Sequence, residues 1–289
     1  MSGLVWGLCG AGLIGVSDCV ARVTASRVSL SVLIALIMIP PFAVMTIWFA
    51  AGGGWPAWNA WGWGASVVSG LLNVAVLALL FRALVRGPVT VASPATSSFT
   101  VMLVALNVLA GHPYHWLHGV AALTVFGGVA MLAKPERPGK ERYDRAWLRV
   151  TALLGLGAAV SVALRMFLAQ EAGAVLGTVP AVYLNRAFAL AGSLGFMALQ
   201  RRRGPLAWPH GTTWPLVLLQ AVLETGALGL FLTGSAGGER VGAAIGFSCF
   251  AAVTAVAARI WLGDRIGLRR LCWMAVVAGG VATAAAATP

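Results

Sequence analysis

Two stretches of the chain match each other at a fixed separation. Gly111–Leu132 and Gly263–Ala284 align without a gap at an offset of 152 positions, and each carries Gly-Gly-Val-Ala near its end. Both copies consist of a polar turn followed by an apolar run. An internal repeat fixes the architecture more firmly than any local pattern. The chain is therefore expected to contain two related halves, which in a membrane protein predicts a transporter with its site between them.

The composition indicates a membrane protein. The 289 residues are 60% hydrophobic and 10% charged, whereas a soluble domain carries roughly 25% charged residues. One water-soluble core cannot bury so much apolar surface, so a polytopic membrane protein is the expected class. The net charge of +12 lies mostly in short connectors between apolar runs, as membrane orientation requires. We therefore expect the lipid bilayer, and no nucleic acid, as a partner.

Apolar runs long enough to cross a bilayer, which takes about 20 helical residues, occur ten times. We expect an all-α integral membrane protein with ten transmembrane helices, arranged as two inverted five-helix repeats. Residues 1–134 form the first repeat, 135–147 a charged cytoplasmic linker and 148–289 the second repeat. An odd number of spans per half inverts the second half relative to the first. Pro40–Pro41 should kink or break the second span. The expected spans are about 3–22, 28–50, 61–84, 88–110, 115–134, 148–170, 177–200, 212–234, 240–262 and 267–286.

Basic residues predict the orientation of these spans. The connectors after the odd-numbered spans and their flanks hold all of the 20 Lys and Arg residues except Arg165, Arg186 and Arg240. Cytoplasmic connectors are enriched in Lys and Arg. Both termini are therefore expected to be extracytoplasmic, in a bacterial-type plasma membrane. Tryptophans gather on the opposite side, as an interfacial aromatic belt does: Trp55, Trp58, Trp61, Trp63 and Trp116.

Corresponding segments recur in both halves in the same order. The third span of each half ends in an Ala- and Leu-rich segment, at Ala78–Leu84 and at Ala227–Leu232. The turn WLGDRIGLRR at Trp261–Arg270 resembles the Gly-Glu-Arg-Leu turn of EamA-like proteins, with Asp264 in place of Glu. The equivalent turn at Gly111 carries no acid. Over essentially its whole length, the chain resembles the EamA-like type of the drug/metabolite transporter superfamily.

This resemblance implies a ten-helix carrier of small metabolites, often directed outward, that works by exchange or by coupling to an ion gradient. Members of the family usually have both termini inside the cell, whereas the charge distribution here predicts the opposite. Because one chain already contains both halves, a monomer is expected to function. We find no nucleotide-binding loop and no serine-hydrolase or zinc-protease motif, and we expect neither a cofactor nor enzymatic activity.

A polar stripe marks the fourth span. Ser93, Thr96, Ser97 and Thr100 are spaced i, i+3, i+4 and i+7, which places them on one helix face. Asn107 lies close to the same face. These side chains could line a substrate cavity, because polar groups within a membrane are costly unless they face a cavity or a partner. Alternatively, the hydroxyls bond their own backbone carbonyls and pack helices together.

Glu224 lies near the middle of the eighth span, where an ionised carboxylate is costly. Gln220 lies one turn before it on the same face. Glu224 could bind and release a proton or hold a substrate ammonium; alternatively, it forms a structural ion pair with Arg165 or Arg186. Arg186, with Tyr183 three residues before it, could instead hold a substrate carboxylate or phosphate.

Further polar residues carry weaker signals. Asp18 lies near the inner end of the first span, where it either pairs with Arg22 at i+4 or contributes to the site. Asn73, in the middle of the third span, is a candidate hydrogen-bonding group. Three histidines are spaced as HxxHxxH in His112–His118, but a proline interrupts them and no acid or Cys completes a ligand set. An interfacial turn, and no metal site, is expected there.

Together these features predict a secondary transporter, in the outward direction, of a small polar metabolite such as an amino acid. It would work by alternating access, with coupling to protons through Glu224. A different class of function stays open at this point: a membrane-embedded accessory or binding protein, or a lipid-modifying enzyme, that uses the same central cavity.

Overall fold

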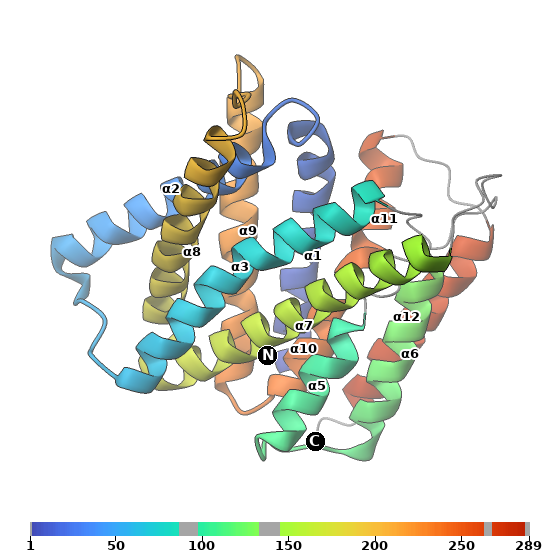
Figure 1. The fold of residues 1–289 in the computed structure, drawn as a ribbon. Coiled ribbons are helices and arrows are strands. Elements are labelled where there is room, and N and C mark those ends of the chain that lie inside the picture. The colour runs from blue at the N-terminus through green and yellow to red at the C-terminus, as the bar shows by residue number, and fades with distance from the viewer. Residues whose placement is uncertain (1, 87–97, 133–144, 263–267, 287–289) are drawn as a thin grey trace.

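The computed structural model describes residues 2–86, 98–132, 145–262 and 268–286, and the regular structure within those ranges is helical (Figure 1). Six of these helices are long and apolar enough to cross a membrane, namely α1, α2 with η1, α3, α7, α8 and α9. They indicate a multi-pass membrane protein. The helices are α1 (Gly3–Thr24), α2 (Leu30–Trp48), η1 (Phe49–Gly53), α3 (Ala60–Arg86), α5 (Phe99–Leu109), α6 (Trp116–Leu132), α7 (Arg145–Leu176), α8 (Thr178–Arg201), α9 (Thr213–Ala236), α10 (Arg240–Ser248), α11 (Phe250–Leu262) and α12 (Leu268–Ala286).

Two of the expected spans differ from their helices. Of the expected kink or break, the structure excludes the break, because α2 continues through Pro40–Pro41; neighbouring helices and side chains in a bundle can satisfy the backbone groups that proline frees. The irregularity follows at η1, a π-helical stretch in which Gly52 has a φ of 114°. The expected ninth span is divided at Cys249 into α10 and α11.

Helices from the two expected halves pack against each other in corresponding pairs. α3 packs along α7 and α8, and α1 packs along α9, α10 and α11. α2 contacts α8 and α9, while α6 and α12 lie side by side (Figure 1). Glycines permit the close approach of α1 to α10, where a Cβ on Gly7 would collide with the carbonyl oxygen of Ala243. Small residues at helix contacts are the usual means of tight packing in lipid, where burial of apolar surface does not drive helices together.

The repeated Gly-Gly-Val segments pack directly on each other. A Cβ on Gly128 of α6 would lie 2.6 Å from Cγ2 of Val277 in α12, and a Cβ on Gly280 of α12 would lie 2.8 Å from Cγ2 of Val125 in α6. Gly128 and Gly280 occupy the same position of the sequence repeat, as do Val125 and Val277. The contact is therefore reciprocal, and the two helices run antiparallel where they meet.

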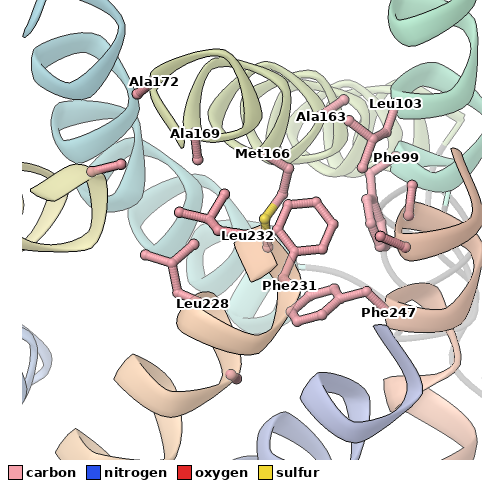
Figure 2. Packing of buried hydrophobic residues seen from close by; sticks show 14 of the residues in the cluster. Phe99, Leu103, Ala163, Met166, Ala169, Ala172, Leu228, Phe231, Leu232 and Phe247 are labelled. Atoms are coloured by element: carbon pink, nitrogen blue, oxygen red, sulfur yellow. The ribbon is translucent and has the colours of Figure 1, made fainter. Parts of the chain in front are cut away.

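The largest apolar cluster lies where α5, α7, α9 and α10 converge (Figure 2). Met166 of α7 points toward Phe231 of α9, and Phe231 packs on Phe247 of α10 with ring centroids 5.1 Å apart. Phe99 of α5 closes the other side. Met166 and Ala169 of this apolar layer lie between Arg165 and Gln170 along α7, and its Leu228 and Phe231 lie between Glu224 and Ser235 along α9, so the layer separates two polar regions.

Candidate functional site

Four charged side chains form the first polar region, here called the central charged cluster: Asp18 of α1, Arg165 of α7, Arg186 of α8 and Glu224 of α9. The charge of Glu224 interacts with those of the other three residues, and the two guanidinium groups repel each other. The cluster thus brings together two acids and two bases from four helices. Ionisable groups inside a membrane bundle are costly, which makes such a concentration a candidate site.

Arg186 is the most deeply buried member of the cluster, with 0% of its surface exposed. Its Nη2 donates to the main-chain carbonyl of Glu224 at 2.8 Å, and its Nη1 contacts Sδ of Met38 at 3.2 Å. Its Nε has no hydrogen-bond partner. Within the described residues, no ion pair joins Arg186 to the carboxylate of Glu224. The guanidinium therefore retains donor capacity for another group.

Asp18 is positioned by a close contact between α1 and α11. A Cβ on Gly15 would lie 2.6 Å from Cγ1 of Val253 and 2.8 Å from the backbone nitrogen of Thr254. The bare backbone of Gly15 lets α11 approach, and Oγ1 of Thr254 donates to Oδ2 of Asp18 at 2.9 Å. Asp18 is half-buried. Its carboxylate therefore faces α11.

Arg165 is held through its backbone. Ser69 of α3 donates to the carbonyl oxygen of Arg165 at 2.9 Å and accepts from Nδ2 of Asn185 at 2.8 Å. Gly70 allows this approach, since a Cβ there would lie 2.8 Å from the carbonyl oxygen of Asn185. Nε of Arg165 is buried without a partner. Ser69 therefore links the backbone of Arg165 to Asn185, the neighbour of Arg186, while the described structure shows no hydrogen bond made by the Arg165 side chain.

Gln220 and Tyr183, which the sequence groups with Glu224 and Arg186, have other partners in the structure. Oε1 of Gln220 accepts from Thr24 at 3.1 Å and ties α9 to the end of α1. Tyr183 is stacked on Phe42, with ring centroids 5.5 Å apart, and its hydroxyl lies 3.4 Å from Oγ1 of Thr46. Gln220 therefore joins α9 to α1, and Tyr183 joins α8 to α2.

Asn73 lies on α3, one turn beyond Ser69, and is 4% exposed. Its Nδ2 has no hydrogen-bond partner. Thr225, next to Glu224, and Ser17, next to Asp18, also carry buried hydroxyls without a partner. Nothing in the sequence distinguishes Thr225 or Ser17, because hydroxyls are common in apolar helices and only the packing shows that theirs are unpaired.

The polar stripe of the fourth span is only partly within the described residues; Ser93, Thr96 and Ser97 lie outside them. Thr100 is buried in α5. Asn107 is fully buried and donates from Nδ2 to Oε1 of Gln170 at 3.0 Å. Asn107 therefore belongs to the second polar region, beyond the apolar layer.

Glu171 is the centre of that second region. Its Oε1 accepts from Nη1 of Arg240 and lies 3.2 Å from Nε2 of His112, and its Oε2 accepts from Nε1 of Trp61 at 3.3 Å. We call these four residues the Glu171 network; it joins α3, α7, α10 and the turn after α5. The sequence offered one signal for it, since Arg240 is the only basic residue in the connectors on its side.

Gln170 reinforces the same end of the bundle. Its Nε2 donates to Oγ of Ser235 at 2.9 Å and to the carbonyl oxygen of Arg240 at 3.2 Å, while its Oε1 binds Asn107. The amide therefore links α5, α7, α9 and α10 in one layer. Side chains from both expected halves close this end.

A cavity of about 330 Å³ lies elsewhere, beside the C-terminal end of α8, and is lined in part by Ser29, Gln200 and Arg203. It is far along α8 from Arg186. We place the candidate site at the central charged cluster, because its buried polar atoms without partners call for a ligand or water.

Comparisons with known proteins bear on the fold alone. No family model matches the chain, and no curated protein matches it. A solved structure described only as "Crystal structure of protein" superposes with a TM-score of 0.77 at 19% sequence identity, covering 98% of this chain and 98% of that one. The whole chain therefore has the fold of that protein.

Proposed function

We propose that the chain is a secondary transporter of a small polar metabolite that works by alternating access. The observation that carries the proposal is the central charged cluster, in which the charge of Glu224 interacts with Asp18 of the first half and with Arg165 and Arg186 of the second. Carriers built from repeats hold their cargo near the midplane, between the halves. Glu224, half-buried beside two guanidinium groups, is the proposed protonatable group.

The helix pairings support an architecture of two inverted repeats. In such an architecture α1 corresponds to α7, α2 to α8 and α3 to α9. The contact of α3 with α7 then corresponds to the contact of α9 with α1, and both are present. Exchanging the two halves leaves the contact between α2 and α8 and that between α6 and α12 unchanged. The reciprocal packing of Gly128 and Gly280 has the symmetry that such an exchange requires. Membership of the EamA-like drug/metabolite transporters is part of this proposal.

The two polar regions suggest how access would alternate. The Glu171 network and the apolar layer below it seal one end of the bundle. Their contacts join α3 and α5 to α7 and α10, so they must separate before cargo can leave through that end. The conformation described here is therefore the one closed at the tryptophan-rich end, and the charged cluster would communicate with the opposite end.

The proposed orientation places the basic end in the cytoplasm of a bacterial-type cell. The connectors after α1 and α8 meet there, since the backbone nitrogen of Ser29 donates to Ala207 at 3.0 Å and Oγ of Ser29 accepts from the nitrogen of Ala207 at 2.8 Å. Arg201, Arg202 and Arg203 adjoin this contact. Positive charge in short connectors is retained on the cytoplasmic side, which puts both termini outside.

The test is solute counterflow in proteoliposomes. Vesicles containing the purified protein are loaded with one member of a panel of amino acids, sugar phosphates, nucleosides, polyamines and quaternary amines, and uptake of the labelled compound is followed. A carrier exchanges label for unlabelled cargo without net flux, and Glu224→Gln removes the response to a pH gradient. Failure of every compound to exchange, from protein that melts cooperatively, would reject the carrier in favour of an accessory protein or a lipid-modifying enzyme.

A further inference from the structure

The hydrogen-bonding capacity left open around the central charged cluster is mostly that of donors. Nε of Arg165, Nε of Arg186 and Nδ2 of Asn73 are all buried N–H groups without a partner. In the same part of the bundle, Oδ1 of Asn185 is the buried group without a partner that can only accept. The hydroxyls of Ser17 and Thr225 can do either. A ligand that satisfies the described groups must therefore bring acceptors.

The acids of the cluster do not use these donors. The carboxylate of Asp18 accepts from Thr254. Glu224 offers Arg186 its main-chain carbonyl, and the described part of the chain contains no ion pair between Glu224 and either arginine. Unpaired buried donors of a charged group are expensive, and arginine is well suited to bind planar carboxylates through two parallel hydrogen bonds.

The mutual repulsion of the two guanidinium groups points the same way. Arg165 and Arg186 come from successive helices, and Ser69 holds the backbone of Arg165 next to Asn185, the neighbour of Arg186. An anion bound to these groups would offset this repulsion, whereas a cation would add to it.

From this arrangement we infer that the cargo is an organic anion, whose carboxylate is bound by Nε and the neighbouring nitrogens of Arg165 and Arg186. An ammonium group on the cargo is not required. The inference rests on the proposed transport function and narrows its substrate class. It assigns substrate binding to the two arginines and proton binding to Glu224. It separates this site from one built for cationic drugs, which would need the acids as its binding groups.

Matched acids and amines test the inference by binding. The melting temperature of the purified protein is measured against 4-methylpentanoate, 3-methylbutylamine and leucine, which share a 3-methylbutyl group and carry the carboxylate, the ammonium or both on it. Glutarate and 1,5-diaminopentane form a second comparison. A ligand that binds only the folded protein raises its melting temperature. We expect the acids to raise it and the amines to leave it unchanged.

Variants then locate the binding groups. Arg165→Gln should weaken acid binding about 10- to 100-fold, the loss typical of a hydrogen bond to a charged group. It is the cleaner variant, because the described structure shows no hydrogen bond made by its side chain. Arg186→Lys, which keeps the charge, should weaken binding less than Arg186→Gln. Arg201→Gln, at the exposed end of α8, is the matched control and should bind like the unmodified protein.

The outcomes separate the inference from the transport function. Stabilisation and counterflow by amines but not by acids would overturn the inference and leave a carrier. Acids that bind through Arg165 and Arg186 but do not exchange across vesicles would uphold the anion-binding site and reject the carrier. Stabilisation by neither class, or acid binding that survives Arg165→Gln unchanged, would overturn the inference.

Discussion

Arg186 binds Glu224 through the main chain, with Nη2 2.8 Å from the carbonyl oxygen of Glu224. This contact fixes α8 against α9 without using the Glu224 carboxylate. The structural role and the chemical role of Glu224 are thereby separated: the backbone provides the first, and the side chain is left for the second.

Glu224→Gln should for this reason fold normally. The carbonyl acceptor remains, so the free energy of unfolding should change by about 1 kcal/mol or less, within the range of ordinary substitutions. The response of counterflow to a pH gradient should disappear, because the amide cannot take up a proton. Thermal unfolding and pH-jump counterflow are the measurements, with Glu141→Gln in the connector between α6 and α7 as the control. Intact pH dependence in Glu224→Gln would remove this residue as the proton site.

Hydropathy predicted a helical membrane protein, and six of the described helices are long and apolar enough to cross a membrane, because the length and apolar character of a span are local properties. The partners of buried side chains could not be predicted in the same way, because they depend on how the helices pack. The sequence suggested an ion pair between Glu224 and Arg186. Whether Arg186 binds the carboxylate or the main-chain carbonyl of Glu224 depends on how far α8 is shifted along α9, which the sequence does not give. Likewise Glu171 and Arg240 are 69 positions apart, and only the packing of α7 on α10 brings them together. The division between α10 and α11 could not be predicted either, because position 249 is a cysteine and not a proline or glycine.

Gly15→Val should separate Asp18 from Thr254. Its Cβ would lie 2.6 Å from Val253 and 2.8 Å from the backbone of Thr254, and the backbone cannot move aside without shifting α11. Overpacking of this kind costs about 1–3 kcal/mol, so the melting temperature should fall. Gly12→Val, on the same helix with open space around it, is the control. Equal melting temperatures for the two variants would show that α1 does not approach α11 as described.

The repeated glycine pairs offer a test of the two-fold packing. A Cβ on Gly128 or on Gly280 meets the partner helix, whereas Gly127 and Gly279 have nothing within 4 Å. Gly128→Ala and Gly280→Ala should therefore each destabilise the protein by about 1–3 kcal/mol. Gly127→Ala and Gly279→Ala should be neutral or slightly stabilising, because alanine favours a helix over glycine by about 1 kcal/mol. The pattern is read from four melting curves, and destabilisation by the first glycine of either pair would contradict the reciprocal contact.

Glu171→Gln should loosen the end of the bundle that the Glu171 network closes. The amide loses the charge that Arg240 pairs with at the join of α7 and α10, and removing one partner of a buried ion pair costs about 3–5 kcal/mol; Glu171 is partly exposed, so a smaller loss is expected. Access to that end is measured with a single reactive cysteine, Ser235→Cys, placed beside Gln170 in a background where Cys9 and Cys272, the exposed native cysteines, are serine. A loss of about 1.4 kcal/mol corresponds to tenfold faster labelling by a water-soluble maleimide, so we expect at least about that increase. Thr233→Cys, which is exposed on the same helix, should label at one rate with or without Glu171→Gln. If Ser235→Cys also labelled at one rate in both backgrounds, the network would be a static support of the helix ends, and alternating access would have to open elsewhere.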